Sequence, residues 1–149
     1  MNPQHITSLE MSQKLKEAGW IKDTPFWWVH NKPRDEDKLC YGLTQCFKDH
    51  PESWEYYPAP LATELLEELP AKISDKTWLA YFKSENGYGG ICEKVGYYEW
   101  ERLLDGSVIH KKIIEFSACC KDPIDKIQYF SLPDALAKLW IYLKKENDG

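Results

Sequence analysis

One short stretch of the chain carries residue types and a spacing that could bind a metal ion. Cys40, Cys46 and His50 follow the pattern C-x5-C-x3-H, as at the end of a zinc finger with three cysteines and one histidine. A structural zinc site needs four ligands, but residues 31–38, where the fourth should lie, contain no cysteine or histidine. His30 lies farther upstream, at a spacing that does not fit the motif. We therefore expect no metal site and interpret the cysteines as small buried thiols.

The chain lacks the sequence features of a nucleophilic enzyme. Such catalysis requires a nucleophile, a base and an orienting group that converge in space. No serine or cysteine lies in a glycine-flanked turn, and the adjacent Cys119 and Cys120 lack the C-x-x-C spacing of redox motifs. His110 could meet Glu115 across a strand, but a strand histidine beside lysines is typical of a solvated residue. We predict that the protein is not an enzyme and needs no cofactor.

Aromatic side chains are the stronger signal for function. The chain has seven tryptophans and nine tyrosines in 149 residues. Adjacent residues in a strand point to opposite faces, so neighbouring rings cannot all be buried on one side of a sheet. Either helices cover both faces and every ring is core, or some rings are exposed and bind a partner. The candidate binding residues are Trp28, Trp54, Tyr56, Tyr57, Tyr98 and Trp100.

These aromatic residues centre on the segment W-E-Y-Y-P-A-P, residues 54–60. Pro58 and Pro60 fix their own φ and push the residues before them out of the α region, so this arm should be extended. Leucines then recur at helical spacing until Pro70 prevents continuation. We predict an extended arm that leads into a two-turn helix over residues 61–69, at the place where two halves of the chain meet.

The N-terminal part of the chain has the signals of a helix. Residues 7–10, T-S-L-E, fit a capping box in which the Thr7 hydroxyl faces the Glu10 amide. A partly apolar face follows, and Gly19 can take the left-handed conformation that ends helices. We predict a helix over residues 8–18.

A second helix is predicted at the C-terminal end. Ser131 is a favourable N-cap, and Asp134 lies near the positive end of the helix dipole. A wide apolar stripe follows, so we expect a helix over residues 131–145 that lies across one face of a sheet. Before it, residues 119–125 should be rich in turns and residues 126–130 a short extended piece.

Strands are predicted on both sides of the arm. Residues 24–30 are rich in aromatic and β-branched side chains, with Pro25 at the beginning of the strand or on an edge. Residues 31–38 should be a charged loop. Residues 39–47 permit a second strand with a bulge at Gly42 or a short helix, and we favour a strand or irregular structure.

Two hairpins are predicted after the arm. Residues 77–84 are apolar on both alternating faces at the start of the segment, which is typical of an interior strand. Asn86-Gly87 is a strong hairpin signal, and residues 88–95 should return as the partner strand. Residues 96–104 fit a helical face or a strand face, and Asp105-Gly106 favours a second hairpin.

Composition excludes several classes of protein. The net charge of −5 argues against a general nucleic-acid binder, which needs a basic surface. A chain that is 43% hydrophobic and 14% aromatic is not disordered, and its length fits one domain. No apolar run approaches the length of a membrane span, and residues 1–10 lack the pattern of a secretion signal. We expect a cytoplasmic protein, with five cysteine thiols and no membrane or nucleic-acid partner.

Three blocks of the chain resemble a known kind of protein. They are M-S-Q-K-L-K-E-A-G-W at residues 11–20, E-Y-Y-P-A-P-L-A-T-E-L-L-E-E-L-P at 55–70 and D-A-L-A-K-L-W-I-Y-L-K-K-E at 134–146. Together they resemble small bacterial proteins encoded in phages and prophages. The family outline would have a serine or threonine cap where Leu61 stands. The resemblance implies a small accessory protein of mobile genetic origin and supplies no catalytic residues.

These patterns predict a single α+β domain over residues 1–149. An antiparallel sheet of about four or five strands should be packed by the C-terminal helix, with the two shorter helices at its periphery. The leading functional hypothesis is a non-catalytic module that binds a protein or a small-molecule ligand through the aromatic residues around the arm.

Two alternative functions come from other classes of protein. One is an acidic antagonist, such as an antitoxin or an anti-defence protein, that occupies a basic target with Glu64, Glu67 and Glu68. The other is a small hydrolase or metal-dependent enzyme that uses His110 or the cluster of Cys40, Cys46 and His50.

Overall fold

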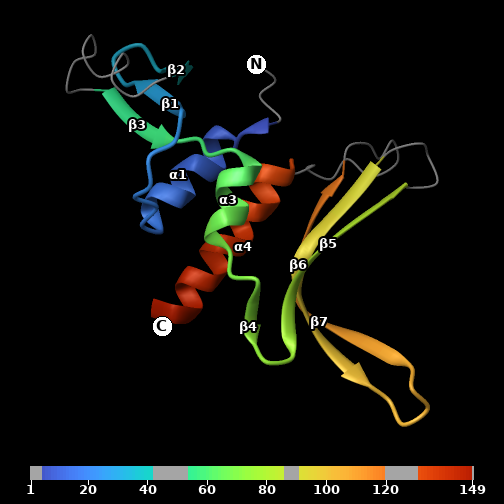
Figure 1. Ribbon diagram of the computed structural model, residues 1–149. Coiled ribbons are helices and arrows are strands. Elements are labelled where there is room, and N and C mark those ends of the chain that lie inside the picture. The colour runs from blue at the N-terminus through green and yellow to red at the C-terminus, as the bar shows by residue number, and fades with distance from the viewer. Residues whose placement is uncertain (1–4, 42–53, 86–90, 120–130, 149) are drawn as a thin grey trace.

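The computed structural model describes residues 5–41, 54–85, 91–119 and 131–148. Within these ranges the chain forms two antiparallel sheets, with strand orders β2-β1-β3 and β4-β5-β6-β7, and three helices (Figure 1). The predicted α+β class and the C-terminal helix against a sheet are confirmed, but the strands are divided between two sheets. In chain order the elements are α1 (Leu9–Glu17), β1 (Phe26–Asn31), β2 (Glu36–Tyr41), β3 (Trp54–Pro58), α3 (Ala62–Glu68), β4 (Lys72–Ser74), β5 (Thr77–Glu85), β6 (Ile91–Arg102), β7 (Val108–Cys119) and α4 (Leu132–Asp148).

The helices form a layer between the two sheets. Figure 1 shows the three-stranded sheet beyond α1, and α3 and α4 on one side of the four-stranded sheet. The main core lies where the helices meet that sheet, because their apolar stripes are buried there. No helix in the described ranges is both long and apolar enough to cross a membrane. The buried core residues are Met11, Leu15, Trp20, Leu65, Leu69, Val95, Tyr97, Ala118, Ala135, Leu136, Ala137 and Leu139.

The elbow at Pro58–Pro60 joins the three-stranded sheet to the helices. The Ala59 amide donates to a carbonyl at the start of β1 at 3.0 Å, and the Thr7 amide donates to the Pro60 carbonyl at 3.2 Å. The Trp28 indole donates to the Thr7 carbonyl at 2.9 Å. All three elbow residues are buried, and the two prolines reduce the number of amide donors that need partners there. The predicted arm and its helix are present as β3 and α3.

Helix α1 is capped by a different hydroxyl from the one that the capping box predicts. Ser8 is the N-cap, and its hydroxyl accepts from the Met11 amide at 3.3 Å. The Thr7 hydroxyl instead bonds to the Ser12 hydroxyl at 2.7 Å in the interior. Both hydroxyls could cap the helix, and the need to satisfy the buried Ser12 side chain decides between them.

The charged loop after β1 is shorter than predicted. The turn ends at Asp35, whose φ of 51° lies in the left-handed region that aspartate tolerates. Strand β2 begins at Glu36 and continues to Tyr41, so the strand interpretation is confirmed that far, and residues 42–47 lie outside the described ranges. An edge strand can carry exposed charges, which explains why a polar sequence pairs here.

Two strands occupy positions that the sequence did not indicate. β1 is the central strand of its sheet, between β2 and β3, with Pro25 just before it. An edge position for this strand is therefore wrong, while Pro25 at its beginning is right. The short strand β4, at Lys72–Ser74, was not predicted because three residues with a single apolar side chain give no periodic signal.

Both predicted hairpins pair as expected. β5 and β6 are antiparallel up to the Glu85–Ile91 pair, and the Asn86-Gly87 turn lies outside the described ranges. β6 and β7 are joined by the turn at Asp105-Gly106, where Gly106 has a φ of 87°. This second hairpin decides the ambiguity of residues 96–104 in favour of a strand. The predicted pieces at 119–125 and 126–130 are not described beyond Cys119, where β7 ends.

One carboxylate ties the beginnings of α1 and α4 together. The Ser131 hydroxyl accepts from the Asp134 amide at 3.3 Å, as expected for an N-cap. The Asp134 carboxylate in turn accepts from the Ser8 amide at 2.8 Å. Burial raises the pKa of Asp134, and the hydrogen bonds from Ser8 offset that effect only in part.

Asp134→Asn should change the pH dependence of stability, because asparagine keeps an acceptor for the Ser8 amide but does not titrate. The folded-state pKa of Asp134 lies above its unfolded value of about 3.9. The stability linked to its proton is therefore fully present below about pH 3.9 and is lost as pH rises through the folded pKa. We expect the wild type to lose unfolding free energy relative to Asp134→Asn over that window, measured by urea unfolding at a series of pH values. A difference that stays constant with pH would contradict the raised pKa.

Gly96 permits a close approach of two strands in the four-stranded sheet. A Cβ atom at this position would lie 2.1 Å from the Ile114 carbonyl oxygen and 2.9 Å from the Glu115 Cα. The register of β6 against β7 shifts directly after it, between Tyr97 and Tyr98. The glycine and the bulge together let the hairpin bend against α4.

Gly96→Ala should therefore destabilise the protein by about 2–3 kcal/mol or prevent folding, because backbone atoms must move to admit the methyl group. Gly106→Ala is the control, since a Cβ there meets nothing within 4 Å and only its positive φ is unfavourable. That strain should cost about 1 kcal/mol. Equal losses in the urea midpoints of the two variants would show that steric overlap at position 96 is not limiting.

Candidate binding surface

The aromatic arm is largely part of the three-stranded sheet. Trp54 and Tyr56 pack against Val29 and Cys40 on one face of that sheet. Both rings are half-buried. Their contribution is therefore to the packing of a small sheet that has few other apolar residues.

The other face of the same sheet is turned toward α1. Tyr57 is the cross-strand partner of Trp28, whose indole is held by the Thr7 carbonyl. Lys16 of α1 lies with its Nζ 5.1 Å from the centroid of the Tyr57 ring and donates to the Tyr56 carbonyl at 2.9 Å. The arm thus joins a sheet and a helix, which is a structural task.

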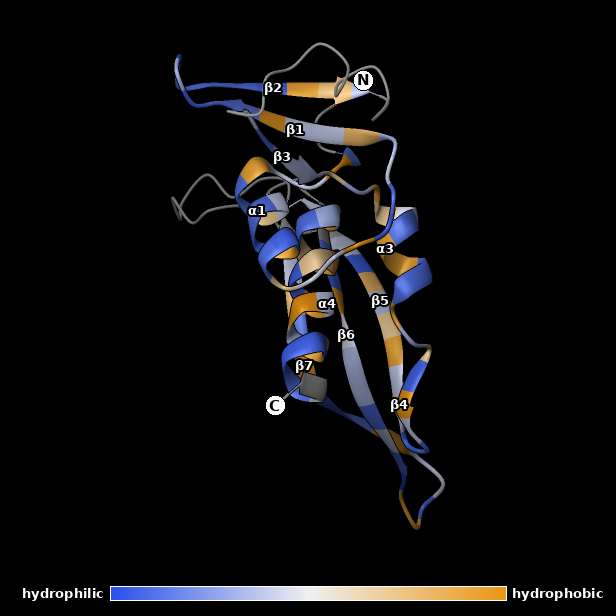
Figure 2. Cartoon of the chain, turned by 90° about the vertical axis from the view of Figure 1, so that its left-hand side faces the viewer, coloured by the Kyte–Doolittle hydropathy of each residue, from blue (hydrophilic) through white to orange (hydrophobic). Residues whose placement is uncertain are grey.

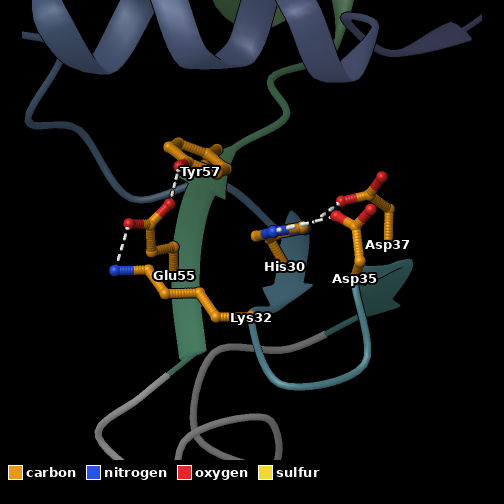
Figure 3. Close-up of polar contacts among 6 residues, drawn as sticks. All are labelled: His30, Lys32, Asp35, Asp37, Glu55 and Tyr57. Atoms are coloured by element: carbon orange, nitrogen blue, oxygen red, sulfur yellow. Dashed lines mark hydrogen bonds and ion pairs between the residues drawn. The ribbon is translucent and has the colours of Figure 1, made fainter.

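A polar cluster extends the Tyr57 side of this sheet (Figure 3). The two ring nitrogens of His30 point at carboxylates, with Nδ1 2.7 Å from Asp37 and Nε2 3.6 Å from Asp35. Because each nitrogen faces a carboxylate oxygen, the ring is held within the cluster and is poorly placed to exchange a proton with a substrate.

Glu55 completes this cluster on strand β3. The Lys32 ammonium, 2.7 Å away, lowers the pKa of Glu55, and a hydrogen bond from the Tyr57 hydroxyl lowers it further. Burial raises the pKa of Tyr57 to about 12, and the Glu55 carboxylate adds to that effect. Tyr57 therefore remains a neutral donor near pH 7, and the cluster behaves as a set of satisfied surface charges.

Tyr98 and Trp100 lie in the other sheet, so the six candidate residues form two separate groups. They belong to β6, on the face of the four-stranded sheet opposite the helices, which we call the outer face. The Trp100 ring lies 5.1 Å from the ring of His110, its cross-strand partner. The Phe82 ring packs edge-on against Tyr98 at 5.2 Å and lies nearly parallel to His110 at 6.1 Å.

Three aromatic rings of the outer face are exposed, and one of them is Trp78 of β5, the cross-strand partner of Tyr98. Relative exposure is 44% for Trp78, 39% for Phe82 and 37% for Trp100, but only 2% for Tyr98. Tyr98 lies beneath the others, and its hydroxyl donates to Glu115. Burial raises the pKa of Tyr98, so the phenol stays neutral. The outer face is thus a layer of exposed rings over a buried tyrosine.

The apolar surface continues along the β6–β7 hairpin. Figure 2 shows this hairpin extending beyond α4, with hydrophobic residues near its tip. Leu103, Leu104 and Val108 are exposed there. No element in the described part of the chain packs on the outer face, since α4 contacts β6 and β7 from the opposite side. An exposed apolar surface of this kind is typical of a binding site.

Strand β6 sorts its charges between the two faces. Lys94 is the cross-strand partner of Phe82 and lies on the outer face, as does Arg102, two residues beyond Trp100. The carboxylates of β6 occupy the alternate positions and point to the helix side: Glu93, Glu99 and Glu101. The outer face is consequently aromatic and basic, although the chain as a whole is acidic.

Trp78 and Phe82 are not among the binding residues predicted from the sequence. Residues 77–84 were predicted as an interior strand, and β5 does lie between β4 and β6. Trp78 and Phe82 are nevertheless exposed, because the helices pack on the opposite face of the sheet. Toward the end of β5, Tyr81 on the helix side is exposed as well. Trp78 and Phe82 lie on the same face of β5 because they are four residues apart in a strand. This two-residue period is the sequence signal that could have grouped them.

Two of the three acidic residues proposed for an antagonist form contacts within the fold. The Glu64 carboxylate accepts from the Leu61 amide and from the Thr24 hydroxyl, each at 2.9 Å. It supplies the helix cap that the leucine cannot. Glu68 forms an ion pair with Lys22. Glu64 and Glu68 are therefore engaged with neighbouring segments, whereas Glu67 is exposed, and the antagonist hypothesis stays a prediction.

Of the three proposed metal ligands, only Cys40 lies within the described ranges. Cys40 is a buried free thiol, while Cys46 and His50 are not described. Among the residues that are described, no group of three or more histidine, cysteine, aspartate or glutamate side chains could hold a metal ion.

The comparisons with known proteins add no assignment. No protein-family model matches the chain, and no curated protein or solved structure shows a significant match to it. The resemblance to phage-encoded proteins therefore stays a prediction, and the functional argument rests on the site itself.

The two aromatic groups should respond differently to mutation. Trp28→Ala removes a half-buried ring and its hydrogen bond to the Thr7 carbonyl, so we expect a loss of about 2–3 kcal/mol in unfolding free energy. Trp100→Ala removes a more exposed ring and should cost about 1 kcal/mol or less. Urea unfolding followed by circular dichroism tests both, and equal losses would contradict the separation into a structural arm and an exposed face.

Proposed function

We propose that the chain is a non-catalytic binding module, of the phage-encoded kind that the resemblance implies, and that its partner binds the outer face. The observation that carries this proposal is the presence of three large exposed rings on one sheet face that no described element covers. The Trp54–Pro60 arm, the first candidate from the sequence, serves the packing of the smaller sheet.

The composition of the outer face supports binding. Tryptophan and arginine contribute strongly to the energy of many interfaces, and this face exposes Trp78, Trp100 and Arg102. The buried Tyr98 and its bond to Glu115 hold the surrounding rings in place before any partner arrives. A preorganised surface loses less conformational entropy on binding.

Photo-crosslinking from the outer face tests this proposal. Benzoylphenylalanine placed at position 100 should capture a partner in a lysate of the expressing cell, because Trp100 lies in the exposed face. The same probe at position 41 is the control, since Tyr41 is also an exposed aromatic residue but belongs to β2.

Substitution on the face should remove the capture. Trp78→Ala, in a protein that carries the probe at position 100, should weaken capture at least about fivefold without lowering the free energy of unfolding by more than about 1 kcal/mol. Equal capture from positions 100 and 41, or capture that Trp78→Ala leaves intact, would remove the outer face as the binding site.

A further inference from the structure

We infer that the partner of the outer face is a single-stranded nucleic acid, whose bases stack on Trp78, Phe82 and Trp100 and whose phosphates contact the neighbouring cations. This inference rests on the proposed function and names its ligand. It departs from the expectation, based on the net charge of −5, that the chain has no nucleic-acid partner.

Each exposed ring on the outer face has a cation beside it. The Lys72 Nζ lies 5.3 Å from the centroid of the Trp78 ring. Lys94 is the cross-strand partner of Phe82. Arg102 follows Trp100 at the next position on the same face of β6. A single strand presents one flat base and one phosphate in every nucleotide, so a surface that places a cation beside each exposed ring can contact both groups.

The charge on this face is positive. Its one carboxylate in the described ranges, Glu115, accepts from the Tyr98 hydroxyl and lies 4.0 Å from Lys94. The cations of the face are Lys72, Lys94, Arg102 and Lys112, and all four are exposed. Binding to phosphates would release condensed counterions, which favours association at low salt.

The net charge of −5 does not oppose this arrangement strongly. The carboxylates of β6 point away from the outer face, toward the helix side of the sheet. Charges separated by more than about 8–10 Å are largely screened at physiological ionic strength. The local surface therefore determines which ligand binds.

Other occupants fit this face less well. In a second copy of the chain packed face to face, Lys94, Arg102 and Lys112 would meet the same cations, and like charges in contact are unfavourable. An acidic protein would satisfy the cations but leave several flat rings without a stacking partner. Duplex nucleic acid would satisfy the cations too, but its bases are already stacked on one another and are not available to the rings.

Fluorescence anisotropy with labelled oligonucleotides tests the inference. We expect oligothymidylate and oligouridylate of about 16 nucleotides to bind the full chain saturably at low salt, and a duplex of equal length to bind more weakly. Comparison of the two single strands shows whether DNA or RNA is preferred. No saturable binding to either single strand, or tighter binding to the duplex, would overturn the inference.

Two matched pairs of variants separate stacking from charge. Trp100→Ala should weaken single-strand binding roughly tenfold without changing its salt dependence, whereas Tyr41→Ala on the other sheet should have no effect. Lys112→Gln should reduce the slope of log affinity against log salt by about 0.7, and Lys111→Gln should not. Lys111 and Lys112 are adjacent exposed residues of β7 that point to opposite faces.

These outcomes distinguish this inference from the function on which it rests. Crosslinking of a protein from position 100 without oligonucleotide binding would overturn the nucleic-acid ligand and retain the binding module. Oligonucleotide binding that Trp100→Ala and Lys112→Gln leave unchanged would place the ligand elsewhere and overturn the inference. Absence of both oligonucleotide binding and capture at position 100 would overturn both proposals.

Discussion

The two-residue period of strand β6 is the constraint on which the rest of the molecule depends. Successive side chains leave opposite faces of a strand, so Val95 and Tyr97 enter the helical core while Tyr98 and Trp100 lie on the outer face. The Tyr97 hydroxyl donates to the Pro70 carbonyl at 2.7 Å, which links this core position to the end of α3. A shift of one residue would bury the cations and expose the core, so the same register maintains both stability and the proposed binding surface.

The proline-rich arm shows that aromatic residues close together in sequence need not form one continuous surface. Its rings are close together in sequence, but they are distributed over both faces of a small sheet and are half-buried there. The elbow that follows is tied to Thr7 and to the beginning of β1. In the four-stranded sheet the rings come from β5 and β6, and strand pairing brings them onto one face. Long-range pairing makes that surface continuous.

The distribution of charge matters more here than its sum. Net charge is a property of the whole chain, and it governs solubility and long-range steering. Recognition occurs within a few ångströms, where Lys94 and Arg102 share a face with the rings while Glu93 and Glu99 lie on the other. Strand β6 has three carboxylates and two cations, yet its two faces differ in charge because the carboxylates occupy one face and the cations the other.

The sequence by itself determined the local elements, because their causes are local. Caps, prolines and 3.6-residue periods located α1, α3 and α4, and turn residues indicated the two hairpins. Tertiary structure alone decided that the strands form two sheets, that β4 exists, and that Trp78 and Phe82 are exposed. A period of two residues establishes that a strand has two different faces, but which face meets a helix depends on segments far away in the chain. The exposed outer face therefore exists only because the helices pack on one side of the sheet.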